Sequence, residues 1–293
     1  MLRSLFSSRR WPGAVASARH GAARVGSVTS VETSTRTLGG GRDADARRAG
    51  PLPPSLPVVL LHGARTSGTM WRAQLDALAR AGRTAVAPDL PGHGRRMGER
   101  FTVDGSLEAI GEAVDAVGGR AVVVGLSLGG YLGIRWAADH PDGAAGLLAS
   151  GCCTEPDRRL TDAWRLAAVV IGRLPDRGAR LNQLLVDLAI PDDGGAALGE
   201  GGFALDVMVD LLTAMRALRP LDDLSRVRCP VRFVNGSLDH FRLQERAFLA
   251  AAPGAERVLV AGATHLVALT HPVAYNRALL DFLDTVDPAR PHG

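Results

Sequence analysis

The chain has 293 residues, of which 46% are hydrophobic and 22% charged, and a formal net charge of +4. These proportions are typical of a globular protein, and no apolar run approaches the roughly 18 residues that a transmembrane helix needs. Every basic residue is an arginine, which excludes chemistry that depends on a lysine, such as Schiff-base catalysis. The excess arginine lies in the first 50 residues, so the remainder is slightly acidic and gives no support to nucleic-acid binding.

Residues 1–26 contain arginine, serine and alanine but no acid. We expect a disordered extension, or a start codon placed too far upstream, rather than a targeting peptide, because the apolar segment is too short for a signal sequence. Residues 27–38 alternate as an edge strand does. The stretch that follows is rich in glycine, proline and charge, and is expected to be a loop.

From residue 57 the pattern alternates between short apolar runs and amphipathic helical segments. Such alternation indicates βαβ units and a parallel sheet. In chain order we predict a strand over 57–61, a helix over 70–82, a strand running into a turn over 84–94, a helix over 106–119, strands over 121–125 and 144–151, a strand over 231–236, a helix over 244–252, a strand over 256–260 and a helix over 272–286.

The segment between the two halves of this pattern, residues 152–220, looks helical throughout and contains no strand pattern. A helical insertion between two strands of one sheet is interpreted as a cap. We therefore expect one core built from residues 27–151 and 221–293, with the cap inserted between them.

The stretch "AVVVGLSLGGYL", residues 121–132, turns from an unbroken apolar strand into a helix, with Ser127 at the turn. Gly125 and Gly129 remove side chains that would collide where strand and helix approach each other. A serine in this GxSxG pattern is expected at strained backbone angles, with its hydroxyl above the sheet. The pattern indicates a nucleophile.

A serine hydroxyl needs a base and an orienting carboxylate. His265 follows the last predicted strand by a short loop, and ligands of open α/β sheets bind at the carboxyl ends of the strands. Asp239 lies a few residues beyond the strand over 231–236 and gives the chain order serine, aspartate, histidine that goes with this pattern. Glu155 is the alternative carboxylate, and His240 is interpreted as a loop neighbour of Asp239.

Two backbone N–H groups are predicted to hold the oxyanion that forms when the serine attacks a carbonyl. One is that of Leu128, directly after the serine. The other is that of Ala64, in the glycine turn of "LHGARTSGTMW" that follows the strand over 57–61.

The motifs "HGARTSGTMW", "APDLPGHG" and "GLSLGG" resemble those of the α/β-hydrolase superfamily, and most of all those of its cofactor-free haloperoxidase and esterase group. The likeness covers roughly residues 28–293 and is weakest in the insertion. It implies the α/β-hydrolase fold, with a mostly parallel central sheet flanked by helices and an inserted helical cap. It also implies a catalytic triad that needs no cofactor and no metal.

We therefore expect a carboxylesterase-like serine hydrolase that cleaves a small or medium hydrophobic ester through an acyl-enzyme. Trp164 and Met208, both in the expected cap, are predicted to bind the substrate. Two alternatives stay open: a hydrolase of C–C bonds, thioesters or lactones on the same triad, and a ligand-binding protein of this fold without turnover.

The three cysteines, Cys152, Cys153 and Cys229, are too few for a disulfide framework and lack the spacing of a zinc site. Free thiols in a reducing compartment are expected. We accordingly predict a cytoplasmic protein that acts on a small molecule and binds neither nucleic acid nor a membrane; the oligomeric state stays open.

Overall fold

The computed structural model describes residues 55–174, 176, 178–180, 184, 190 and 192–287. All of them fall in the second of the two units into which the chain divides, Ala49–Gly293. The expected extension over 1–26 and the expected edge strand over 27–38 lie outside the described residues.

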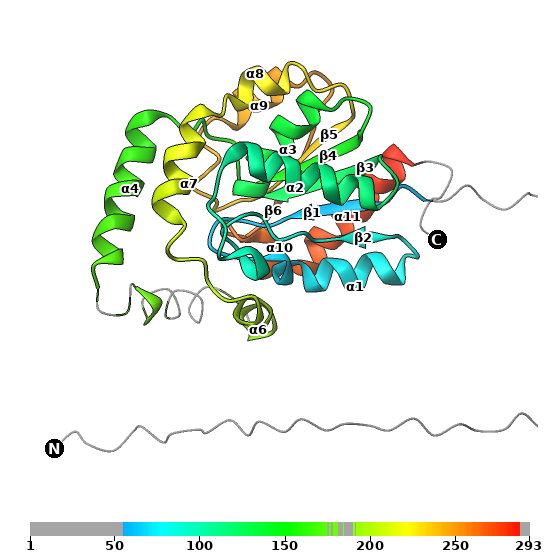
Figure 1. Ribbon diagram of the computed structural model, residues 1–293. Coiled ribbons are helices and arrows are strands. Elements are labelled where there is room, and N and C mark those ends of the chain that lie inside the picture. The colour runs from blue at the N-terminus through cyan, green and yellow to red at the C-terminus, as the bar shows by residue number, and fades with distance from the viewer. Residues whose placement is uncertain are drawn as a thin grey trace, which may run out of the picture. The chain divides into compact units, whose positions relative to one another are not determined.

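A parallel sheet of six strands lies at the centre of this unit, in the order β2-β1-β3-β4-β5-β6 (Figure 1). The predicted parallel sheet is thus confirmed. The strands are β1 Val58–Leu61, β2 Ala85–Val86, β3 Ala121–Leu126, β4 Ala144–Ser150, β5 Val231–Gly236 and β6 Glu256–Val260.

The strand running into a turn that is predicted over 84–94 is present, and its strand part, β2, spans only Ala85–Val86. Pro88 has no N–H to give to a ladder. The next residue, Asp89, uses its carboxylate to bind backbone N–H groups of two loops, which requires the chain to leave the sheet.

Helices cover both faces of the sheet (Figure 1). One face carries α2 Val103–Ala116, α3 Leu128–Asp139, α8 Pro220–Leu224 and α9 Glu245–Ala251; the other carries α1 Arg72–Arg80, α10 Val267–Thr270 and α11 Pro272–Val286. Short 3-10 helices span η1 Gly68–Trp71, η2 Gly94–Arg96 and η3 Met215–Ala217. The helix predicted over 272–286 is confirmed, and it begins with a proline at its first turn, where the missing N–H has no helical partner to lose.

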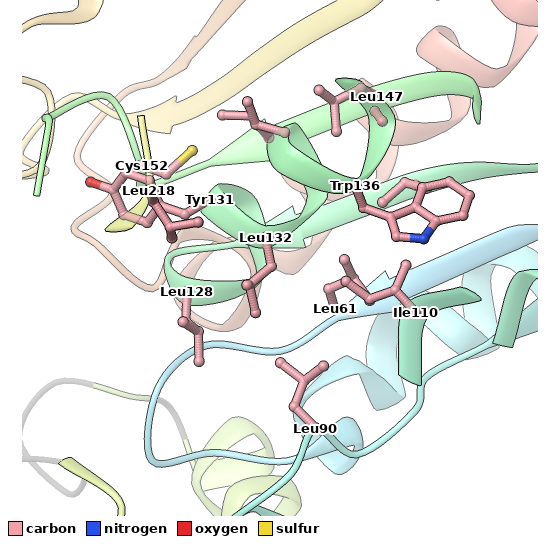
Figure 2. Close-up of a cluster of buried hydrophobic side chains, with 14 of the residues drawn as sticks. Leu61, Leu90, Ile110, Leu128, Tyr131, Leu132, Trp136, Leu147, Cys152 and Leu218 are labelled. Atoms are coloured by element: carbon pink, nitrogen blue, oxygen red, sulfur yellow. The ribbon is translucent and has the colours of Figure 1, made fainter. Parts of the chain in front are cut away.

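Alternate residues of the strands supply two separate hydrophobic cores. In β1, Val59 and Leu61 belong to the core under α2 and α3, whereas Val58 and Leu60 belong to the core under α1 and α11. Figure 2 shows part of the first core, where Leu128 and Leu132 of α3 lie in the same cluster as Leu61. Since β1, β3 and β4 are buried along their whole length, their sequences are near-continuous apolar runs.

The segment between β4 and β5 contains α4 Arg158–Gly172, α6 Asp192–Glu200 and α7 Met208–Ala214. Helix α4 packs on α7, and α6 contacts η1 (Figure 1). Within the described part of 152–220 there is no strand. Among all the described helices, none is long and apolar enough to cross a bilayer.

The Asp89 carboxylate ties the loop after β2 to the loop after β1. Its Oδ1 accepts a hydrogen bond from the Gly68 N–H at 2.8 Å, and its Oδ2 accepts one from the Arg95 N–H at 3.0 Å. Burial alone would raise the pKa of this carboxyl, but the N–H groups of Arg95 and Gly68 and the Arg95 side chain bring the pKa below its ordinary value. The charged form is therefore the one that the fold stabilises.

We expect Asp89→Asn to lower the free energy of unfolding at pH 7 by about 1–3 kcal/mol, because the amide cannot accept all these hydrogen bonds. A carboxyl whose pKa is lowered by folding contributes stability above its unfolded pKa and loses it as the pH falls through the folded pKa. The gap between wild type and variant should therefore be constant from pH 7 to 5 and shrink below about pH 4. Urea denaturation over this pH range measures the difference in the free energy of unfolding between the two proteins. A difference that widens in acid would contradict the conclusion that the fold stabilises the charged form of Asp89.

Candidate active site

Ser127 occupies the turn between β3 and α3 with φ of 56° and ψ of −116°. Among the described non-glycine residues, Ser127 and Arg65 alone have a positive φ. Such a conformation costs of order 1–3 kcal/mol and persists only where the surroundings enforce it. Here the Ser127 N–H donates to the Ser150 carbonyl at 2.7 Å, and the Ser127 carbonyl accepts from the Tyr131 N–H at 3.1 Å.

Gly125 and Gly129 are required by close approach of backbone to backbone. A Cβ at Gly125 would lie 2.2 Å from the Gly129 carbonyl oxygen, and one at Gly129 would lie 2.2 Å from the Leu61 carbonyl oxygen. The collision expected from the sequence is thus present, and it involves β1 as well as the two ends of the turn.

His265 and Asp239 meet Ser127 at the carboxyl ends of the strands. The His265 Nε2 lies 3.0 Å from the Ser127 Oγ, and the His265 Nδ1 lies 3.1 Å from the Asp239 Oδ1. Asp239 follows β5 and His265 follows β6, so three distant parts of the chain contribute to one site. With Nδ1–H donating to the carboxylate, Nε2 is free to accept the serine proton.

The environment of Asp239 favours its ionised form. Burial would raise the pKa of this carboxyl, but the hydrogen bond and charge of His265 and the Phe241 N–H, which donates to Oδ1 at 2.8 Å, bring the pKa below its ordinary value. The other carboxylate oxygen, Oδ2, is buried and accepts no hydrogen bond from the described residues.

Gly151, directly after β4, lies against this pair. A Cβ at Gly151 would lie 2.9 Å from the His265 Cε1 and 3.3 Å from the Asp239 Oδ2. Its φ is +61°, and its N–H donates to the Asn235 Oδ1 at 2.9 Å. Asn235 in turn donates to the Glu245 Oε1 at 2.9 Å.

Sequence reasoning did not single out Gly151 or Asn235. The available signal was an asparagine near the end of the predicted strand "VRFVNG", and the structure buries its side chain completely. A buried polar side chain requires a hydrogen-bond partner. The bonds of Asn235 to Gly151 and to Glu245 join the end of β4, β5 and the start of α9.

The predicted oxyanion donors belong to the two loops nearest Ser127. Leu128 is the first residue of α3. Ala64 follows Gly63, where a Cβ would lie 3.6 Å from the Ser127 Cβ. Neither Ala64 nor Leu128 donates its N–H to another described residue, so both groups are available to a ligand.

The alternative carboxylate does not reach the imidazole. Glu155 lines a separate cavity of about 580 Å3 together with Arg158, Arg216 and other residues, while Asp239 pairs with His265. His240 lies beside the pair, with its ring 5.3 Å from that of His265. Burial, together with the neighbouring His265, lowers the pKa of His240, which favours a neutral ring there.

The two predicted substrate-binding residues differ in their relation to the site. Trp164 of α4 is 47% exposed and stacks on Phe241 at 6.4 Å between ring centres, and Phe241 in turn lies 4.7 Å from the His265 ring. Met208 begins α7 and packs against the core under α3.

A larger groove, of about 840 Å3, lies beside the edge strand β2 and is lined by Ala85–Asp89, Glu200 and residues of the loop after β1. None of Ser127, Asp239 and His265 lines it. This groove is therefore separate from the place where Ser127, Asp239 and His265 meet.

Residues 58–278 match the Alpha/beta hydrolase family. The chain belongs to this family. The putative carbamate hydrolase RutD from Caulobacter is 30% identical over 255 residues, which cover 80% of this chain and 92% of that protein. This membership confirms the predicted fold and the resemblance of the three motifs to the α/β-hydrolase superfamily. It also classes the chain with hydrolases.

Two other relatives match over smaller parts of their length. The chain spans 36% of an AB hydrolase superfamily protein from Gibberella zeae and 12% of the polyketide synthase ThaQ from Burkholderia thailandensis, each at 30% identity.

Among solved structures, a thermophilic esterase from Thermogutta terrifontis has a TM-score of 0.66 at 22% identity, covering 80% of this chain and 91% of that one. A putative non-heme bromoperoxidase from Mycobacterium tuberculosis has a TM-score of 0.66 at 20% identity, covering 80% and 93%. At these identities the two structures show the shared fold.

We expect Gly125→Ala to lower the free energy of unfolding by about 2 kcal/mol or more, because its Cβ must displace the backbone at Gly129. Gly111→Ala on α2 is the matched control. A Cβ there meets nothing closer than 3.8 Å, and alanine is the better helix former, so stability should rise by up to about 1 kcal/mol. Equal effects of the two substitutions in urea denaturation would contradict the steric account.

Gly151→Ala should reduce kcat for the ester hydrolysis that is proposed below by about 10- to 100-fold, because the new Cβ displaces the imidazole from the serine. Circular dichroism and thermal denaturation establish that the variant is folded at the assay temperature. The Gly111→Ala protein serves again as the control and should keep the wild-type kcat. A folded Gly151→Ala protein with wild-type kcat would refute the positioning role.

Proposed function

We propose that the chain is a serine hydrolase that cleaves small or medium hydrophobic carboxylic esters through an acyl-enzyme. The observation that carries this proposal is the 3.0 Å distance between the His265 Nε2 and the Ser127 Oγ, with Asp239 on the other imidazole nitrogen. Family membership supports it, as does the esterase among the structural neighbours.

In the proposed reaction the Ser127 Oγ attacks the ester carbonyl while His265 takes the hydroxyl proton. The N–H groups of Ala64 and Leu128 stabilise the oxyanion, and two such donors together provide several kcal/mol of transition-state stabilisation. His265 then protonates the leaving alcohol. Water repeats the sequence on the acyl-enzyme and releases the acid.

Asp239 contributes by orienting the imidazole and stabilising its positive charge in the transition state. Its lowered pKa keeps the carboxylate charged throughout the neutral pH range. The helical insertion is proposed as a cap, with Trp164 reaching the site through Phe241 and offering an apolar surface to the acyl or leaving group. The free cysteines Cys152, Cys153 and Cys229 support a reducing, cytoplasmic location as part of the proposal.

Carbamate hydrolysis is a second candidate function. It is favoured by the match to the putative carbamate hydrolase RutD, which covers 92% of that protein. A carbamate presents the same kind of carbonyl to the serine. A panel of 4-nitrophenyl acetate, butyrate, octanoate and palmitate beside a 4-nitrophenyl carbamate separates the two functions. We expect the highest kcat/KM for butyrate or octanoate.

Ser127→Ala should lower kcat by about 10^4-fold or more and abolish labelling by a fluorophosphonate probe, because no other hydroxyl among the described residues is hydrogen-bonded to His265. Ser225→Ala is the matched control: its exposed hydroxyl donates to the Asp222 carbonyl, and this variant should be labelled like the wild type. Esterase activity retained in Ser127→Ala would refute the assignment. A folded wild-type protein that neither hydrolyses the esters nor takes the probe would instead be a ligand-binding member of the family.

A further inference from the structure

Arg65 occupies an unusual place in the loop after β1. It is a non-glycine residue with a φ of 63°, and it directly follows the proposed oxyanion donor Ala64. Its carbonyl accepts a hydrogen bond from the Ala204 N–H of the insertion at 3.1 Å. The backbone of Arg65 is therefore fixed where the loop beside Ser127 meets the segment proposed as the cap.

The guanidinium of Arg65 has no counter-charge within the described part of the chain. Its side chain is partly buried, yet none of the described acidic residues forms an ion pair with it, and its nitrogens donate to no described acceptor. Burial lowers the pKa of this guanidinium from its ordinary value. By contrast, the partly buried Arg242 is paired with Glu245, and the buried Arg83 is paired with two aspartates.

A cation that is partly withdrawn from water and has no counter-charge among the described residues costs free energy. A protein keeps such a group most readily where a ligand supplies the missing charge, and arginine suits a carboxylate because its planar fork offers two parallel N–H donors. The position of Arg65 in the loop beside Ser127 restricts this ligand to a molecule that binds near the serine. Gly63, two residues earlier, lies against Ser127, with its Cβ position 3.6 Å from that of the serine.

We propose that Arg65 forms an anion subsite of the active site and binds a carboxylate carried by the substrate near its ester group. The inference rests on the proposed function and narrows it to esters of small acids or alcohols that bear a carboxylate. Phe241 and Trp164, stacked on the His265 side of the site, would contact the apolar remainder of the same molecule.

Two pairs of esters that differ only in charge test this subsite. The first pair, 4-nitrophenyl hemisuccinate and its methyl ester, places the carboxylate on the acyl side. The second pair, 4-acetoxybenzoic acid and its methyl ester, places it on the leaving group. In at least one pair, the wild type should have a 10- to 100-fold higher kcat/KM for the anionic ester than for its methyl ester, because charge-assisted hydrogen bonds strengthen binding by about this factor.

Arg65→Gln should reduce this preference by at least about tenfold, and Arg65→Lys should keep part of it, because a point charge replaces the bidentate fork. Arg277→Gln is the matched control. It makes the same charge change at an exposed position of α11 and should keep the wild-type preference. Absence of a preference in both pairs, or a preference unchanged in Arg65→Gln, would overturn the subsite.

A binding measurement separates this proposal from the proposed hydrolysis. In the Ser127→Ala protein, sodium succinate should raise Tm above that in sodium chloride of the same ionic strength, because the anion binds the folded state alone. The increase should disappear in the Ser127→Ala, Arg65→Gln double variant. If the wild type hydrolyses none of the esters, the proposed function fails, and this Tm comparison still decides the role of Arg65.

Discussion

The site depends on one backbone constraint, the left-handed turn at Ser127. The turn places the serine between a buried strand and a buried helix that approach each other too closely for side chains at Gly125 and Gly129. Its unfavourable conformation is maintained by the packing of β3 and α3, both of which belong to the cores. The hydroxyl is thus held in position before any substrate arrives, which is what preorganised catalysis requires.

The parallel topology explains why residues far apart in the chain meet at this turn. All six strands point the same way, so the loops after β3, β5 and β6 emerge at one edge of the sheet and carry Ser127, Asp239 and His265. The loop after β4 contributes Gly151, whose missing side chain leaves room for the imidazole. Four neighbouring strands therefore define the site, and the hydrogen bond between Gly151 and Asn235 fixes the relative position of two of them.

Much of the fold could be predicted from the sequence because its signals are local. Strands buried on both faces have continuous apolar runs, and helix α11 begins at Pro272. The three proposed catalytic residues follow strands, so their approximate place was predictable as well. The parts that depend on tertiary neighbours were not predictable. The exact end of β2 goes with the binding of Asp89 to the loop after β1, and Asn235 matters through contacts across the sheet. That Arg65 has no counter-charge among the described residues is visible only in three dimensions.

The insertion that holds α4, α6 and α7 leaves the sheet after β4 and returns to its neighbour β5. Those two strands pair directly, through Leu147–Ala149 and Val231–Phe233, so no ladder hydrogen bond depends on the length or sequence of what lies between them. Side chains of the insertion such as Leu211 and Leu218 nevertheless belong to the core under α2 and α3, so an exchanged insertion has to bring apolar side chains of matching shape to that core. Chimeras joined at the ends of β4 and β5 would keep the ladder between these two strands and would reveal whether the proposed cap sets the range of accepted substrates.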